Sequence, residues 1–208
     1  MNEFKTAQEA FWAGEFGNDY IGRNESRELL ASNLNFFSHA LRSAEKISSC
    51  IEFGANIGMN LKAIQLLHPS VSLNGIEINE TAAGQLKQVI GEDNVFNGSI
   101  YDYPAGKTFD LALIKGVLIH INPEMLPVVY EKMYNASGKY ILVCEYYNPS
   151  PVTIPYRGHN DRLFKRDFAG EMLDKYSDLK LVDYGFAYKR DTVFPQDDIT
   201  WFLMEKKK

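Results

Sequence analysis

The stretch CIEFGANIGMN, Cys50 to Asn60, carries the clearest structural signal in the chain. A short apolar run ends around Glu52, two glycines follow at Gly54 and Gly58, and a helical pattern begins directly after them. A strand, a glycine turn and a helix in this order present backbone N–H groups to a nucleotide-like ligand. The stretch therefore predicts a nucleoside site and leaves open whether its ligand carries phosphates or positive charge.

Outward from this stretch, predicted strands alternate with predicted helices along most of the chain. Apolar periodicity and turn signals give strands at 47–53, 72–76, 94–96, 109–115, 140–145, 179–188 and 199–204, and helices at 6–12, 26–46, 58–67, 80–90, 123–137 and 168–176. Continuously apolar strands joined by helices favour a parallel sheet covered on both faces. We therefore expect an α/β fold: a doubly wound, mostly parallel seven-stranded Rossmann-like sheet with an antiparallel C-terminal hairpin and an N-terminal helical segment.

Composition and charge restrict the function classes. The 208 residues suit one compact domain, which we divide into a helical cap or lid at 1–45 and a Rossmann-like part at 46–208. A net charge of −5 disfavours a nucleic-acid partner, whose phosphates attract basic surfaces. We recognise no targeting segment and no membrane span, and Cys50 and Cys144 suit reduced core positions. These features lead us to expect a cytoplasmic protein without a metal site or membrane contact.

The residues around the turn distinguish an anionic dinucleotide from a cationic nucleoside. A dinucleotide fingerprint starting at Gly54 would need glycines where this chain has Asn56 and Met59. Glu52, two residues before Gly54, would repel a pyrophosphate but attract an ammonium or a sulfonium. Glu77, at the predicted end of the next strand, suits hydrogen bonds from the two hydroxyls of a ribose. The pattern thus favours a nucleoside that carries positive charge.

The ordered set EFGANIG, GIEIN and FDLALIKGVLIHI resembles the class I S-adenosylmethionine-dependent methyltransferases. The likeness covers most of 47–147, the last two strands are similar to that family's reversed hairpin, and Asn56 stands where the family often has glycine. The resemblance implies S-adenosylmethionine as cofactor and S-adenosylhomocysteine as product. It also implies a cofactor site built from Trp12, Tyr20, Glu52, Gly54, Ala55, Asn56, Gly58, Glu77, Ile78, Asn79, Ser99, Ile100, Lys115, Gly116 and Val117.

Within this expected site, the residues after each strand would contact a different part of the cofactor. The turn at 54–58 would pass under the methionine part of the cofactor, and Glu52 would hold the ammonium directly or through water. Glu77 would bind the ribose, and Ser99 and Ile100 would flank the adenine. The alternatives are a helix-dipole partner for Glu52, a surface acid for Glu77 and a plain turn around Ser99.

A second resemblance lies mostly outside this core. The segments FKTAQEAFWAGEFGNDYIGRN (4–24) and KGVLIHINPEMLP (115–127) are similar to methyltransferases associated with the biosynthesis of pseudaminic-acid-type sugars. That subfamily implies a small polar acceptor, a sugar or sugar nucleotide, methylated on oxygen during the synthesis of a surface glycan such as a nonulosonic acid, capsule or flagellin glycan. The residues themselves leave O-methylation and N-methylation both open.

His120 follows the predicted strand at 109–115, where members of the class I family often direct a residue at the acceptor. An imidazole with a pKa near neutrality can take the proton of a hydroxyl as methyl transfer proceeds, so we expect His120 to be the catalytic base. The alternative is a histidine that hydrogen-bonds the next helix, where Asn122 suits the N-cap. Alignment of the reacting atoms alone can also drive methyl transfer without a base.

Two further segments suit the walls of an acceptor site. The first carries the aromatic residues Phe11, Trp12, Phe16 and Tyr20 together with Arg23, and either forms a lid over the cofactor or packs on the sheet edge. The second, at 145–167, is long and polar, as functional loops often are. Its expected substrate-binding residues are Tyr147, Asn148, Tyr156, Arg157 and His159. A carboxylate or phosphate on the acceptor can pair with Arg157, Arg162 and Arg166.

Two other function classes stay open at this point. An NAD-dependent oxidoreductase would use the same kind of fold, and Glu52, Asn56 and Met59 disfavour it. A non-catalytic nucleoside-binding or regulatory subunit would keep the fold without turnover. The intact turn, Glu77 and the polar acceptor wall argue against such a subunit.

Overall fold

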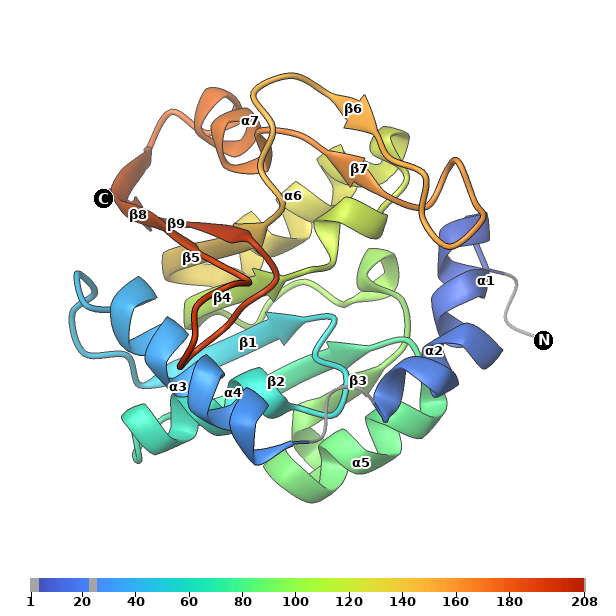
Figure 1. The fold of residues 1–208 in the computed structure, drawn as a ribbon. Coiled ribbons are helices and arrows are strands. Elements are labelled where there is room, and N and C mark those ends of the chain that lie inside the picture. The colour runs from blue at the N-terminus through green and yellow to red at the C-terminus, as the bar shows by residue number, and fades with distance from the viewer. Residues whose placement is uncertain (1–3, 23–25, 208) are drawn as a thin grey trace.

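The computed structural model describes residues 4–22 and 26–207. Strands β3, β2, β1, β4 and β5 of its main sheet run parallel, and β9 runs antiparallel between β5 and β8 (Figure 1). In sheet order the strands are β3 (Val95–Asn97), β2 (Ser72–Glu77), β1 (Ser49–Phe53), β4 (Phe109–Lys115), β5 (Ser137–Glu145), β9 (Ile199–Lys206) and β8 (Leu179–Ala187). The expected seven-stranded sheet with an antiparallel C-terminal hairpin is confirmed.

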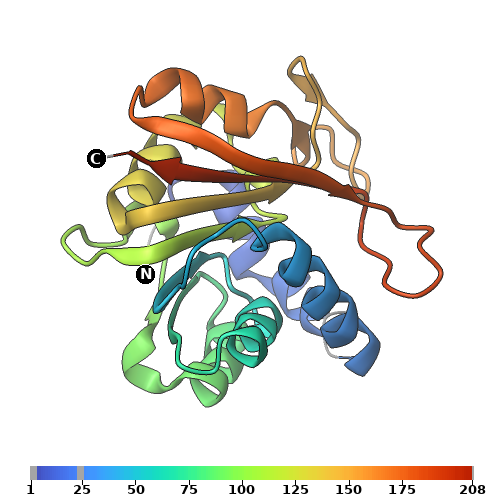
Figure 2. The same cartoon turned by 90° about the vertical axis from the view of Figure 1, so that its left-hand side faces the viewer.

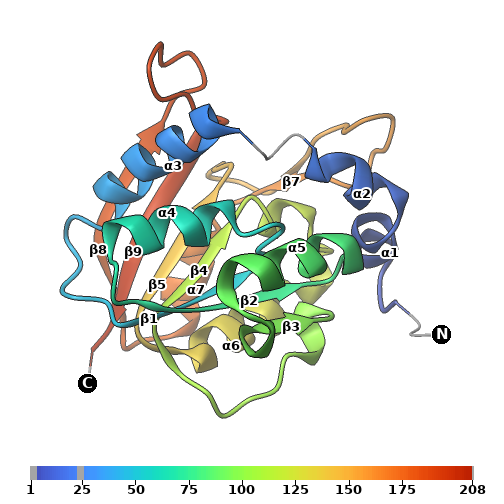
Figure 3. The ribbon, with the colours of Figure 1, turned by 90° about the horizontal axis from the view of Figure 1, so that it is seen from below.

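Helices cover both faces of this sheet (Figures 2 and 3). One face carries α3 (Arg27–Ala40), α4 (Met59–Leu67) and α5 (Glu80–Ile90), and the other carries α6 (Leu126–Ala136) and α7 (Phe168–Lys175). Two short helices, α1 (Ala7–Ala13) and α2 (Glu15–Ile21), lie beside the carboxyl ends of β1 and β2. Of the residues grouped in the expected cap, α1 and α2 therefore flank the strand ends, whereas α3 packs on the sheet.

The apolar pattern of the central strand explains this two-layer covering. In β4, Leu111 and Leu113 point into the core beneath α3 and α4, while Ala112 and Ile114 point into the core beneath α6 and α7. Successive residues of a strand face opposite sides of the sheet, and helices cover both sides. All four side chains are therefore fully buried. The two cysteines, Cys50 and Cys144, are likewise buried and form no disulfide.

The observed elements differ from the predicted ones in four main places. The helix predicted at 26–46 ends at Ala40, and the one predicted at 123–137 opens with a 3₁₀ turn before α6. The polar loop at 145–167 contains an unpredicted two-stranded sheet, and α2 was not predicted either. The short elements involved are β6 (Val152–Thr153), β7 (Phe164–Lys165) and the 3₁₀ turns η1 (Glu92–Asn94), η2 (Ile100–Asp102), η3 (Leu118–His120) and η4 (Pro123–Met125).

The sheet topology determines where a ligand can bind. Strand β1 pairs with β2 on one side and with β4 on the other, so the chain order reverses between β1 and β4. In open α/β sheets, ligands bind beyond the carboxyl ends of the strands at such a point. None of the helices in the described parts of the chain is both long and apolar enough to span a lipid bilayer.

Candidate active site

The turn after β1 has the backbone conformation that its two glycines predict. Gly54 and Gly58 have φ angles of 77° and 85°, in the left-handed region where glycine is favoured. A Cβ on Gly54 would lie 2.6 Å from Cγ2 of Val117, so the close approach of the next loop also requires glycine. Asn56 has a φ of 47°, and asparagine is among the few other residues that adopt this conformation readily. The departure from glycine at this position therefore leaves the turn intact.

Most N–H groups of this turn are already used within the protein. Those of Gly54 and Ala55 both donate to the carbonyl oxygen of Ile76 at 2.9 Å, and that of Gly58 donates to Ala55 at 2.9 Å. The N–H of Asn56 donates to Oε2 of Glu77 at 2.7 Å. A pyrophosphate cradle needs free N–H donors at such a turn. This turn instead lies among carboxylates.

Glu77 ends β2 directly beside the turn. The side chain is buried, and its Oε1 accepts from the N–H of Asn79 at 2.8 Å while Oε2 accepts from Asn56. Burial raises its pKa, and the backbone donors work against that shift. Each carboxylate oxygen has two lone pairs, so Glu77 keeps acceptor capacity toward the cavity that it lines.

Two more ionisable side chains lie under the same strand ends, Glu52 fully buried and Lys115 partly buried. Oε1 of Glu52 accepts from Nδ2 of Asn60 at 2.6 Å, whereas Oε2 has no hydrogen-bond partner among the described residues. Burial raises the pKa of Glu52 to about 8. Lys115, at the end of β4, is partly buried, and the loss of solvent around its ammonium lowers its pKa. Glu52 lies behind Asn60, and both Asn60 and Lys115 border the cavity.

A cavity of about 280 Å³ opens over these strand ends. It brings together most of the residues expected to bind a cofactor: Trp12, Tyr20, Gly54, Ala55, Asn56, Glu77, Ile78, Asn79, Ser99, Ile100, Lys115, Gly116 and Val117 all line it. Glu52 and Gly58 lie outside the lining, Gly58 as the N-cap residue of α4. In the described parts of the chain, no group of three or more His, Cys, Asp or Glu side chains is arranged to bind a metal ion.

The N-terminal helices form one wall of the cavity. The Trp12 ring lies 5.3 Å from that of Tyr20 and 4.7 Å from that of His120, measured between centroids. A Cβ on Gly17 would lie 1.9 Å from the carbonyl oxygen of Trp12, so the contact between α1 and α2 requires glycine there. Arg23, which we grouped with these aromatic residues, lies outside the described residues.

His120 lines the cavity in a defined tautomer. Its Nδ1 lies 2.6 Å from the carbonyl oxygen of Arg162, and a carbonyl can only accept, so Nδ1 carries the proton and Nε2 carries the lone pair. The sequence led us to expect a pKa near neutrality. Burial instead lowers the pKa of His120 to about 4, which keeps the imidazole neutral at pH 7.

The expected acceptor wall is only partly at the cavity. Tyr156 lines it, with its ring 5.2 Å from that of His120. Four other expected residues lie outside the lining: Tyr147 packs on Phe202, Asn148 bonds the carbonyl of Ser150, Arg157 covers the rings of Phe16 and Tyr156, and His159 contacts Phe11. Arg162 and Arg166 pair with Asp161 and Glu171, which argues against their use for an anionic acceptor.

Several residues that line the cavity, or that bond the residues lining it, were not among the expected site residues. Asn33 of α3 accepts from Nε2 of Gln196 at 3.0 Å, and this contact brings the loop between β8 and β9, with Asp197, to the cavity. Glu145, at the end of β5, accepts from the N–H groups of Val117 and Leu118 at 2.9 and 2.8 Å. Burial raises its pKa to about 7. Its position at a strand end was the one available hint.

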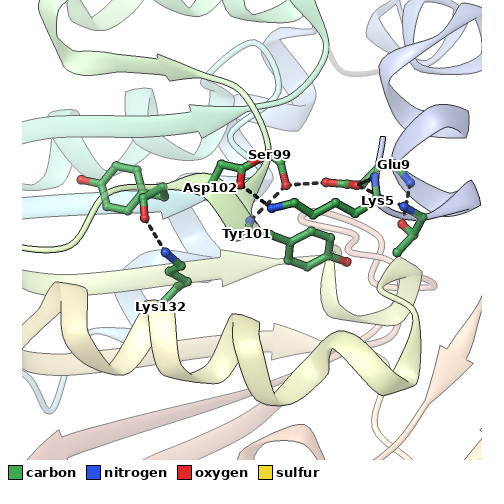
Figure 4. A network of polar contacts seen from close by, with 8 residues as sticks. Lys5, Glu9, Ser99, Tyr101, Asp102 and Lys132 are labelled. Atoms are coloured by element: carbon green, nitrogen blue, oxygen red, sulfur yellow. Dashed lines mark hydrogen bonds and ion pairs between the residues drawn. The ribbon is translucent and has the colours of Figure 1, made fainter. Parts of the chain in front are cut away.

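A further unexpected contact joins α1 to the loop after β3. Ser99 donates its hydroxyl hydrogen to Oε1 of Glu9, and Lys5 pairs with Asp102 in the same seam (Figure 4). Glu9 is only 8% exposed and lines the cavity beside Ser99. The cap is thus attached to the part of the cavity expected to hold a base.

Comparison with known proteins gives the fold. No family model matches the chain, and no curated protein matches it in sequence. The solved structure of a 1,6-didemethyltoxoflavin-N1-methyltransferase from Burkholderia thailandensis, with bound S-adenosylhomocysteine, has a TM-score of 0.70 and 14% identity over 100% of this chain and 94% of its own. A magnesium protoporphyrin IX methyltransferase from Synechocystis, with bound S-adenosylmethionine, has a TM-score of 0.67 and 11% identity over 99% and 100%.

A third similar structure is a mitomycin 7-O-methyltransferase, with a TM-score of 0.66 and 13% identity over 97% of this chain. The chain spans 61% of the length of that protein. At these identities the likeness is one of fold. The chain has the Rossmann-like fold that these methyltransferases share.

Proposed function

We propose that this protein is a methyltransferase that uses S-adenosylmethionine and acts on a small polar acceptor. The observation that supports this proposal is the turn after β1: most of its N–H groups are used within the protein, and it lies beside the buried carboxyls of Glu52 and Glu77. A cationic group bound at this edge would stabilise the ionised form of these buried carboxyls, whereas a pyrophosphate would raise their pKa values further and find few free N–H donors. The same observation disfavours an NAD-dependent oxidoreductase, which needs free donors there.

Unpartnered buried atoms fit this cofactor. Oε2 of Glu52 and Oδ1 of Asn56 are buried without a hydrogen-bond partner among the described residues, and buried polar atoms of this kind are normally satisfied. Glu77 would accept from the ribose hydroxyls, and Lys115 would face the carboxylate of the methionine part. Glu52, which is fully buried and does not line the cavity, would hold the ammonium through a water molecule. When bound, the cofactor supplies a methyl group made electrophilic by the adjacent sulfonium.

We further propose that the acceptor is a sugar or sugar-linked hydroxyl in the synthesis of a surface glycan. The resemblance of 4–24 and 115–127 to methyltransferases of pseudaminic-acid-type sugar pathways supports this. The remaining cavity lining supports it as well, because Asn33, Tyr156 and Asp197 combine hydrogen-bonding groups with an aromatic face. The free cysteines favour a cytoplasmic protein.

Within this proposal, His120 accepts the proton of the acceptor hydroxyl at Nε2. The contact of Nδ1 with Arg162 sets the tautomer that leaves Nε2 basic. Since the pKa of His120 is about 4, the base is in its active, neutral form throughout the neutral range, and we expect its protonation to reduce turnover only near pH 4.

We expect His120→Asn to lower kcat about 100-fold or more, since the amide N–H can still donate to the Arg162 carbonyl while Nε2 is lost. His120→Ala removes both groups and serves as the comparison. The measurement is the rate of S-adenosylhomocysteine formation with an identified acceptor between pH 5 and 9. A His120→Asn enzyme with the wild-type rate across that range would exclude the role as a base.

The direct test of the proposed function is ligand binding. We expect S-adenosylmethionine and S-adenosylhomocysteine to raise the thermal unfolding midpoint, by roughly 5–10 °C at 100 times the dissociation constant, and NAD to leave it unchanged. A shift with NAD alone would overturn the proposal. Turnover with one of a panel of sugar nucleotides would distinguish an enzyme from a non-catalytic nucleoside-binding subunit.

A further inference from the structure

Glu9 and Ser99 form a paired wall at the end of β3 (Figure 4). Both line the cavity, although they come from segments 90 positions apart in the sequence. Ser99 donates to Oε1 of Glu9 and accepts from the N–H of Tyr101 at 3.0 Å. Oε2 of Glu9 accepts from the N–H groups of Lys5 at 2.7 Å and Thr6 at 3.3 Å.

These contacts use every hydrogen that the wall can donate. The single hydroxyl hydrogen of Ser99 goes to Glu9, and a carboxylate has none. What remains toward the cavity is acceptor capacity only, at Oε1 of Glu9 and at Oγ of Ser99. A ligand group that fits this wall must therefore donate hydrogen.

The strand order places this wall relative to the proposed cofactor. Along the sheet, β1 carries the turn at 54–58, β2 carries Glu77, and β3 leads to Ser99. A nucleoside with its ribose at Glu77 and its charged tail toward β1 and β4 has its base over the end of β3. Ile78 and Ile100 line the cavity there and suit the faces of a base.

Resting on the proposed function, we propose that Glu9 and Ser99 recognise the exocyclic amino group of the base, so that the site accepts a 6-aminopurine and rejects a 6-oxopurine. An amino group donates to the wall. A 6-oxo group is itself an acceptor, so it cannot hydrogen-bond Oε1 of Glu9 or Oγ of Ser99. All three oxygens would then be removed from water without a donor. The cap helix α1 thereby takes part in choosing the cofactor.

The helix cap makes this recognition testable by a single substitution. Thr6 and Glu9 form a capping box in which the Glu9 side chain accepts from the N–H of Thr6. Glutamine serves equally well at this position of a capping box, with its carbonyl oxygen as the acceptor. In Glu9→Gln the oxygen stays on Lys5 and Thr6, and the amide NH₂ turns toward the base. The wall then changes from acceptor to donor.

The experiment compares S-adenosylhomocysteine with S-inosylhomocysteine by isothermal titration calorimetry. We expect the wild-type protein to bind the adenosine ligand at least about tenfold more tightly, as for one charge-assisted hydrogen bond. In Glu9→Gln we expect this ratio to fall at least tenfold. Thr6→Ala is the control: it breaks the capping box but keeps the carboxylate, so both ligands should weaken alike and the ratio should persist.

The outcomes separate this inference from the proposed function. Wild-type protein that binds the two ligands equally, or a Glu9→Gln ratio that matches the wild type, would overturn the recognition by Glu9 and leave the methyltransferase proposal standing. Wild-type protein that binds neither ligand would remove the proposed function itself. The wild-type comparison needs no variant, so the inference stays testable even if Glu9→Gln folds poorly.

Discussion

Glu77→Gln is expected to weaken the binding of S-adenosylhomocysteine about 100-fold to 10,000-fold. Two hydroxyl hydrogen bonds to a buried carboxylate contribute about 1.5–3 kcal/mol each. Glutamine has a single oxygen, so its NH₂ would also face the N–H of Asn56 or of Asn79, both of which donate to Glu77. The loss should appear as a raised dissociation constant in calorimetry and as a missing thermal shift.

A matched control lies three residues further along the chain. Glu80 is exposed on the first turn of α5, and Glu80→Gln makes the same chemical change away from the cavity. We expect its dissociation constant to equal that of the wild type. If Glu77→Gln keeps its fold by circular dichroism and binds as tightly as Glu80→Gln does, Glu77 is not the ribose ligand.

The sheet could be predicted because its signals are local. The strand at 109–115 is apolar at nearly every position, and the structure buries it on both faces. The helix at 80–90 is observed at its predicted bounds, since Asn79 caps its first turn and Gly91 ends it. Glu77 was recognisable for the same reason, because a strand and a helix with clear limits leave few residues between them.

The cavity walls were harder to predict because their contacts join distant segments. Nothing near Glu9 indicates that its partner is Ser99, and nothing near Gln196 indicates Asn33. The helix α2 was missed because Gly14 and Gly17 weaken its local helical signal. Gly17 is needed for a reason that only the fold reveals, its contact with the backbone of Trp12.

Glu52→Gln is expected to change how the stability of the protein depends on pH. The pKa of Glu52 is about 8 in the folded protein against an ordinary value of 4.5, so between these pH values the folded state holds a proton that the unfolded state has lost. The free energy of unfolding therefore falls as pH rises through this window, by up to about 1.4 kcal/mol per pH unit. Glu52→Gln imitates the protonated form and removes this slope.

We thus expect Glu52→Gln to match the wild type near pH 4.5 and to exceed it by several kcal/mol at pH 8, measured by urea unfolding. Glu124→Gln, on the exposed surface, should follow the wild-type curve. If the Glu52→Gln and wild-type curves stay parallel from pH 4.5 to 8, the carboxyl of Glu52 has the same pKa in the folded and the unfolded protein, and burial does not raise it.

The ionisation of Glu52 should also be measurable as proton release when the ligand binds. At pH 7 a carboxyl with a pKa of about 8 is mostly protonated, and an ammonium that Glu52 holds would stabilise its ionised form. Binding of S-adenosylhomocysteine should then release about one proton from the wild-type protein, seen as a binding enthalpy that depends on the buffer's ionisation enthalpy. Glu77 and Glu145 also have raised pKa values, but their contribution is common to both proteins. The difference between wild type and Glu52→Gln therefore isolates Glu52, and equal proton release would mean that Glu52 does not hold the ammonium.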